Sequence, residues 1–180
     1  MGFFSKLLGM KDTAEEMKKL ENAISMMRMG VFGYLSNKVY APRFGKDEGA
    51  LWAMAVLNTV DLFPPGNEQA RTFYEKNEDQ IWQEALQIKK YPILSGDTGG
   101  VSYIYFASIF YANAMRNNPN IDHAKKNAYS IRANELEERA SQLGIFIPSH
   151  RNVCNSTDPF DVIDRIILVS PEVMKSCMSS

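Results

Sequence analysis

The sequence predicts an all-α fold, a single-domain bundle of about six helices around a central, nearly all-apolar helix at about residues 101–117. Two observations support this prediction. Apolar side chains recur at alternating steps of three and four, the spacing that places them on one face of a helix. Prolines, glycines and asparagines interrupt the pattern at intervals and divide it into segments of helical length.

The first predicted helix begins at Thr13. Thr13 and Glu16 have the spacing of a capping box, in which each side chain accepts a hydrogen bond from the other residue's free amide. One apolar seam follows, made of Met17, Leu20, Ile24, Met27, Val31 and Tyr34. Pro42 is expected to end the helix. Gly30 and Gly33 indicate either a bend or the close approach of a neighbouring helix.

Two more helices are expected before residue 92. The first begins near Asp47, a good cap, and ends at Pro64 and Pro65, which cannot donate helical hydrogen bonds. Asn67 can cap the second, with Glu68 in the first turn, where the macrodipole favours a carboxylate. The apolar side chains of these two helices are Leu51, Trp52, Met54, Val56, Leu57, Val60, Phe73, Tyr74, Ile81, Trp82 and Leu86.

The central helix is apolar around almost its whole circumference from Val101 to Met115, so we expect neighbours on every side, with Phe106 and Ile109 deeply buried. A further helix covers about residues 121–143.

Gly144 suits the left-handed position just past the end of that helix. A short extended piece over residues 145–148 follows. Asp158 and Pro159 then begin another helix, and Ser170-Pro171 is expected to begin a separate, short last one.

Length and charge narrow the class of protein. With 180 residues the chain suits one domain, residues 1–180, with residues 1–11 as a loosely attached apolar amino-terminal segment. The net charge of -1 and the scattered lysine pairs offer no basic face, so we expect no nucleic-acid partner.

No stretch reaches the ~18 to 20 apolar residues of a transmembrane segment. Two cysteines, Cys154 and Cys177, and no secretory signal favour a cytoplasmic location with reduced thiols, with a disulfide as the alternative.

Metal and cofactor chemistry find little support in the sequence. The two histidines, His123 and His150, lack a Glu or His at the i+3 or i+4 spacing of metal-binding helices. Asp158, Asp161 and Asp164 are spaced for a shared helix face and for Mg²⁺, but first-turn carboxylates are also stabilised by the helix dipole. We therefore predict no metal, no cofactor and no catalytic set.

Three places carry candidate sites. Tyr74, Trp82, Tyr103 and Tyr111 form either an aromatic core or the lining of a ligand pocket. Thr98, Gly99 and Gly100 either cap the central helix or hold an anion with their amides. Phe3, Phe4, Leu7 and Leu8 share helical spacing and are expected to dock on the chain's own fold, on a partner, or at a membrane surface.

These observations favour a non-enzymatic helical protein that binds another protein as an inhibitor or scaffold. A homodimer formed through the seam of the first helix is an alternative to packing of that seam inside the bundle. The other functional hypotheses are a small-molecule binding protein with an aromatic-lined pocket, and an enzyme whose site is assembled from dispersed residues.

Overall fold

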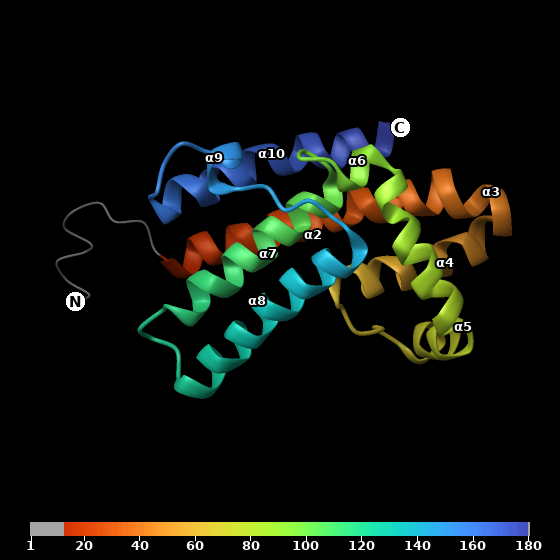
Figure 1. Cartoon of the computed structure of the whole chain (residues 1–180), viewed down its shortest axis with the longest axis horizontal. Coiled ribbons are helices and arrows are strands. Elements are labelled where there is room, and N and C mark those ends of the chain that lie inside the picture. The colour runs from red at the N-terminus through yellow and green to blue at the C-terminus, as the bar shows by residue number, and fades with distance from the viewer. Residues whose placement is uncertain (1–12, 180) are drawn as a thin grey trace.

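The computed structural model describes residues 13–179, which form an all-helical bundle without strands (Figure 1). The long helices are α2 (Thr13–Tyr34), α4 (Lys46–Asp61), α5 (Glu68–Gln87), α7 (Gly100–Arg116), α8 (His123–Leu143) and α10 (Pro159–Ser179). Short helical turns join them: η1 (Leu35–Tyr40), α3 (Ala41–Phe44), η2 (Ile88–Lys90), α6 (Pro92–Ser95) and α9 (His150–Val153). The predicted all-α fold class is confirmed.

Helix α7 occupies the centre of the bundle, as its apolar circumference predicts. It lies between α8 on one side and α2 with α10 on the other (Figure 1). Phe106 and Ile109 are both buried, as expected. The predicted seam of α2 is largely buried as well, because α10 packs along that helix and α7 crosses it. That seam is therefore used inside the chain.

Glycines allow the central helices to approach closely. A Cβ atom on Gly30 of α2 would lie 2.8 Å from the Cα atom of Met174 of α10. A Cβ atom on Gly100, the first residue of α7, would lie 2.7 Å from a methyl carbon of Val31. Of the two interpretations of Gly30, the close approach of a neighbouring helix is the one that the structure supports.

The prediction that Pro42 ends the first helical segment was wrong. Helix α2 continues through the π-helical turn η1 into α3, and the segment ends at Gly45, whose φ is 82°. In η1 the amide of Ala41 donates to the carbonyl of Ser36, five residues back. Pro42 then falls in the first turn of α3, where a missing amide hydrogen costs little.

The prediction of a separate last helix at Pro171 was also wrong, since α10 passes through this proline without a break. Proline cannot donate to the carbonyl four residues back, which here belongs to Ile167. The hydroxyl of Ser170 donates to that carbonyl instead, at 2.9 Å. A local side-chain donor thus satisfies the carbonyl that Pro171 cannot reach.

Several predicted helix ends are confirmed. Asn67 caps α5 by accepting a hydrogen bond from the amide of Ala70, and Gly144 is left-handed with φ 66° at the end of α8. Asp158 accepts a hydrogen bond from the amide of Phe160 at the start of α10. Asp47 lies within the first turn of α4 and does not cap it.

Candidate functional site

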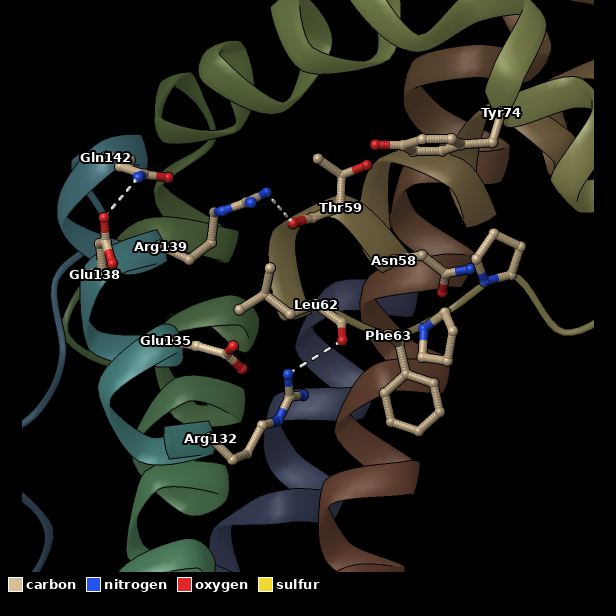
Figure 2. A pocket seen from close by; sticks show the side chains of 12 residues that line it. Asn58, Thr59, Leu62, Phe63, Tyr74, Arg132, Glu135, Glu138, Arg139 and Gln142 are labelled. Carbon is tan, nitrogen blue, oxygen red and sulfur yellow. Dashed lines mark hydrogen bonds between the residues drawn. The ribbon is translucent and has the colours of Figure 1, made fainter. Parts of the chain in front are cut away.

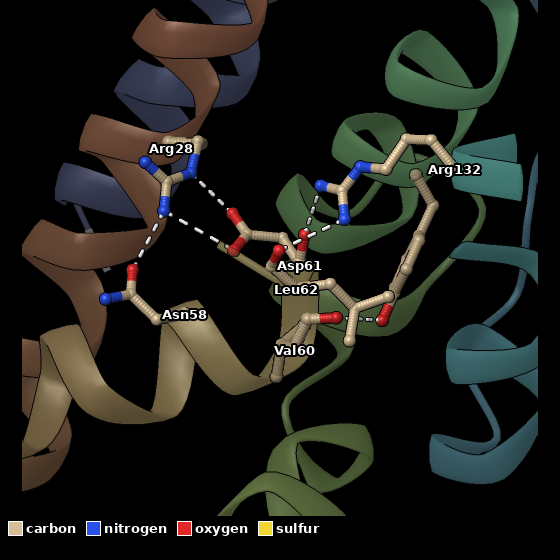
Figure 3. A network of polar contacts seen from close by, with 7 residues as sticks. Arg28, Asn58, Val60, Asp61, Leu62 and Arg132 are labelled. Carbon is tan, nitrogen blue, oxygen red and sulfur yellow. Dashed lines mark hydrogen bonds and ion pairs between the residues drawn. The ribbon is translucent and has the colours of Figure 1, made fainter. Parts of the chain in front are cut away.

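The carboxyl end of α4 is buried, and side chains from α7 and α8 satisfy its last carbonyl groups (Figures 2 and 3). Arg139 donates to the carbonyl of Thr59 at 2.7 Å, and the Tyr105 hydroxyl donates to that of Val60. Arg132 donates to the carbonyls of Asp61 and Leu62, at 2.7 and 3.1 Å. The last carbonyl groups of a helix have no donor within the helix and usually accept hydrogen bonds from water. Here residues 58–61 are buried, so side chains take the place of water.

A buried ion pair completes this network. The guanidinium of Arg28 on α2 binds the carboxylate of Asp61, which is 3% exposed, and also donates to the side chain of Asn58 at 3.1 Å (Figure 3). Burial raises the pKa of Asp61, and the positive charges of Arg28 and Arg132 oppose this shift. The network joins α2, α4, α7 and α8 at one point of the bundle.

A polar cavity of about 640 Å³ adjoins this network (Figure 2). Its lining residues are Asn58, Thr59, Leu62, Phe63, Pro64, Pro65, Tyr74, Arg132, Glu135, Glu138, Arg139 and Gln142. The two arginines already donate to carbonyls of α4, and two glutamates balance their charge. The observed geometry therefore serves to close the end of α4, and we do not assign a ligand to this cavity.

An apolar groove of about 520 Å³ lies where α2 begins, α7 ends and α10 begins. Its walls are Thr13, Met17, Phe106, Ile109, Phe110, Asn113, Ala114, Asn117, Asn118, Pro119, Asn120, Ile147, His150, Pro159, Phe160 and Ile163. Among the described residues, no Asp, Glu, Lys or Arg lines it. We refer to this hollow as the apolar groove.

Aromatic rings form part of the wall of the apolar groove. The centroid of the His150 ring lies 5.7 Å from that of Phe106 and 5.8 Å from that of Phe110, in edge-to-face geometry. The two phenyl rings are stacked at 6.3 Å. Such packing fixes the orientation of the rings and leaves an apolar surface of defined shape. Phe160 adds a third, half-buried phenyl ring from α10.

The chemistry open to the apolar groove is binding of an apolar group. His150 is the one titratable side chain among its described lining residues, and no carboxylate or thiol on the wall could act with it. Aromatic and methionine side chains without charged neighbours are typical of the buried centre of protein interfaces. The volume also falls within the ~300 to 1,000 Å³ of small-molecule pockets.

The aromatic residues of the predicted ligand pocket have different neighbours. Tyr74 lines the polar cavity, and the ring of Trp82 lies 5.0 Å below the guanidinium of Arg139. Tyr103 is buried in the core, and burial raises the pKa of its hydroxyl. Tyr111 donates to Glu21 at 2.6 Å and its ring meets that of Tyr129. Arg139 contacts Trp82 and lines the same cavity as Tyr74, whereas Tyr103 and Tyr111 have contacts elsewhere.

The loop before α7 shows why glycines are needed there. A Cβ atom on Gly99 would lie 2.5 Å from the carbonyl carbon of Leu94, and one on Gly100 would meet Val31 and Cys177. Both glycines are buried, whereas Thr98 is exposed. Close packing accounts for the two glycines of the predicted anion site. The predicted interaction residues Phe3, Phe4, Leu7 and Leu8 lie outside the described residues.

Over residues 13–179, no group of three or more His, Cys, Asp or Glu side chains could hold a metal ion. His123 and His150 are exposed on separate elements, and both cysteines are free thiols. Within the same part of the chain, no helix is long and apolar enough to cross a bilayer.

Comparison with known proteins adds no assignment: no family model matches the chain, and no match was found among curated proteins or solved structures.

Sequence reasoning missed the residues of the apolar groove. They come from four separate stretches of the chain, and each stretch also has a role in the core or in a turn. One signal was available. Phe160 and Ile163 follow the predicted cap at Asp158 at a spacing of three, so they share a face near the exposed beginning of a helix. The partner elements of that face could be found only from the folded structure.

Proposed function

We propose that this chain is a protein-interaction domain that binds an apolar-faced helical segment of another protein in the apolar groove. The observation that carries the proposal is the composition of the groove, which combines aromatic rings with the complete lack of charged lining residues among residues 13–179. A helix that places apolar side chains at i, i+3, i+4 and i+7 in a groove uses a common mode of peptide recognition.

The geometry of the groove supports this kind of partner. Its floor is rigid, because Met17, Ile109 and Ile163 are buried core residues of three different helices. Its rim is polar but uncharged, with Asn113, Asn117 and Asn120 placed to bond a peptide backbone or its polar side chains. A buried apolar centre with a polar rim is the usual anatomy of a protein interface.

We also propose a cytoplasmic location and a non-enzymatic role. Both cysteines are free, and burial raises the pKa of the Cys177 thiol to about 11, which keeps it protonated and unreactive. The bound protein would be regulated or held in place by the contact itself.

Selection of peptides tests the proposal. A displayed library of random peptides of about 16 residues, ~24 Å when helical, is selected on the full-length chain. We expect enriched peptides with Leu, Phe, Trp or Met at i, i+3 or i+4, and i+7. Phe160→Asp should weaken their binding at least ~30-fold, the loss typical of a central interface residue. Asp at this position lies in the first turn of α10, where the helix dipole tolerates it.

Leu168→Asp is the matched control. Leu168 lies on the same helix, is 66% exposed, and does not line the groove. Its replacement should leave peptide affinity unchanged. Equal loss of binding in both variants would contradict the proposal. If the selection yields no peptide while a small apolar molecule binds in the groove, the ligand-binding alternative would be favoured.

A further inference from the structure

We propose that the chain's own amino-terminal segment, through Phe3, Phe4, Leu7 and Leu8, covers the apolar groove when no partner is bound. This inference rests on the proposed function, because it assigns a regulator to the same groove. The segment and a partner helix would compete for one surface, so binding of the partner requires release of the segment.

The place where the segment joins the fold is the first observation. Thr13, the first described residue, is itself part of the groove wall, and Met17 on the next turn of α2 is another part. Leu8 is five positions before Thr13, a distance of at most roughly 17 Å along an extended chain. The chain length therefore places residues 3–8 within reach of the apolar groove.

The chemistry of the segment matches that of the groove. Phe3, Phe4, Leu7 and Leu8 have the spacing of one helical face, and Lys6 is the one charged side chain in residues 2–10. The groove wall offers phenyl rings and aliphatic side chains without a charge among its described residues. A short tether also gives the segment an effective concentration on the order of mM, so even weak contacts would keep the groove covered.

A buried carboxylate at the tether is a second, independent observation. Glu16 is 3% exposed, and its Oε2 atom has no hydrogen-bond partner in the structure. Its other oxygen accepts a hydrogen bond from Lys19 at 3.1 Å. Glu16 lies one helical turn after Thr13 of the groove wall, beside the groove but outside its lining. A buried carboxylate oxygen is costly without a donor, and the ammonium group of Lys6 would supply one as the segment docks.

Paramagnetic labelling tests this arrangement. The full chain carries Ser5→Cys and Cys154→Ser, and a nitroxide is attached at position 5. We expect selective broadening of the amide signals of Ala114 and Ile163 in the groove, with no effect at Thr72 on the distant helix α5. Adding Phe4→Asp and Leu8→Asp should abolish the broadening, whereas Asn22→Asp on the exposed face of α2 should leave it intact.

The competing outcomes can be separated. Unlabelled full chain with Phe4→Asp and Leu8→Asp should bind the selected peptides at least 5-fold more tightly than the unchanged chain. Equal peptide affinity of the two proteins would overturn the proposed regulation and leave the proposed interaction function standing. Broadening of the groove signals by the label at position 5, without binding of any peptide, would overturn the interaction function alone. A third outcome would point to a membrane contact. The spin label at position 5 would then broaden the groove signals only weakly, and strong broadening would appear when vesicles of phosphatidylcholine and phosphatidylserine are added. Loss of cooperative melting in the double variant would also contradict the proposal, because a releasable segment is not needed for folding.

Discussion

The hydroxyl group of Tyr105 is fully buried and donates its hydrogen bond to the carbonyl of Val60, near the end of α4. Burial also raises the pKa of this hydroxyl, so it stays protonated as a donor. Helix α4 is followed by Leu62, a non-glycine residue with φ 56°. The amides of Leu62 and Phe63 donate to the carbonyl of Asn58, and the side-chain donors of α7 and α8 satisfy the carbonyls of residues 59–62 that follow it.

Tyr105→Phe is expected to lower the free energy of unfolding by ~1 to 3 kcal/mol, because it leaves a buried carbonyl without a donor. Tyr74→Phe is the control. Tyr74 is half-buried on the wall of the polar cavity, and the loss of its hydroxyl should change stability by less than ~0.5 kcal/mol. Urea titration followed by circular dichroism measures both. Equal effects would mean that the Tyr105 hydrogen bond contributes little.

The thiol of Cys177 predicts a dependence of stability on alkaline pH. Burial raises its pKa from about 9 to about 11, so the unfolded chain loses this proton first as pH rises. The corresponding stability is complete below pH 9 and is lost between about pH 9 and 11. The loss is roughly 3 kcal/mol at most.

Cys177→Ala removes this ionisation. Its free energy of unfolding should fall less steeply than that of the unchanged chain between pH 9 and 11. Cys154→Ala serves as the reference. Parallel curves for all three proteins in this range would show that Cys177 ionises alike in the folded and unfolded states.

At the scale of the helix, the two glycines of α2 have opposite roles. Gly30 packs against the backbone of Met174, so a Cβ atom there would push α2 and α10 apart. At Gly33 the nearest atom to a Cβ would be the Cγ of Met178, at an ordinary 3.7 Å. Gly30→Ala should therefore destabilise the protein by ~1 to 3 kcal/mol. Gly33→Ala should stabilise it by ~0.5 to 1 kcal/mol through the better helix propensity of alanine.

Thermal and urea unfolding of these two variants measure the difference. The two substitutions are chemically identical and only three residues apart. A general effect of helix propensity would therefore change the free energy of unfolding in the same direction in both variants. Stabilisation by Gly30→Ala would mean that α2 and α10 do not approach as closely as the structure shows.

The helices that sequence reasoning predicts well are those whose signals are local. The cap at Asn67 and the left-handed Gly144 depend on neighbours within a few residues, and both were predicted. Pro42 and Pro171 were misinterpreted for a different reason. Whether a proline ends a helix depends on what satisfies the freed carbonyl, here the Ser170 hydroxyl or a π-helical turn, and sequence pattern does not reveal that.

At the scale of the whole molecule, the central position of α7 was predictable because its burial is visible in its composition. The apolar groove was not predictable in this way. It exists because the start of α2, the end of α7 and the start of α10 lie together, so that Phe110 and Phe160, about 50 positions apart in sequence, line one groove. A close approach of this kind depends on helix lengths and crossing angles, which residue patterns determine only weakly.

The core also predicts how the molecule unfolds. One cluster of buried side chains continues from Met17 of α2 to Cys177 of α10 and includes Trp52 of α4. A continuous core favours a single cooperative transition, which would establish residues 13–179 as one folding unit. Trp52 and Trp82, the two tryptophans, report on α4 and α5, whereas far-UV circular dichroism reports on every helix.

We therefore expect the two signals to have the same urea midpoint, and Ile166→Ala to lower both midpoints equally. Ile166 is fully buried in α10, which packs on α2 and α7, away from the tryptophans on α4 and α5. Its truncation typically costs ~2 to 5 kcal/mol. If the fluorescence midpoint stayed in place while part of the dichroism was lost earlier, α4 and α5 would form a unit of their own. Equal shifts of both midpoints, the expected result, would mean that a contact at α10 also stabilises α4. Helix α2 can transmit this effect, because α10 packs on α2 and Arg28 of α2 binds Asp61 at the end of α4.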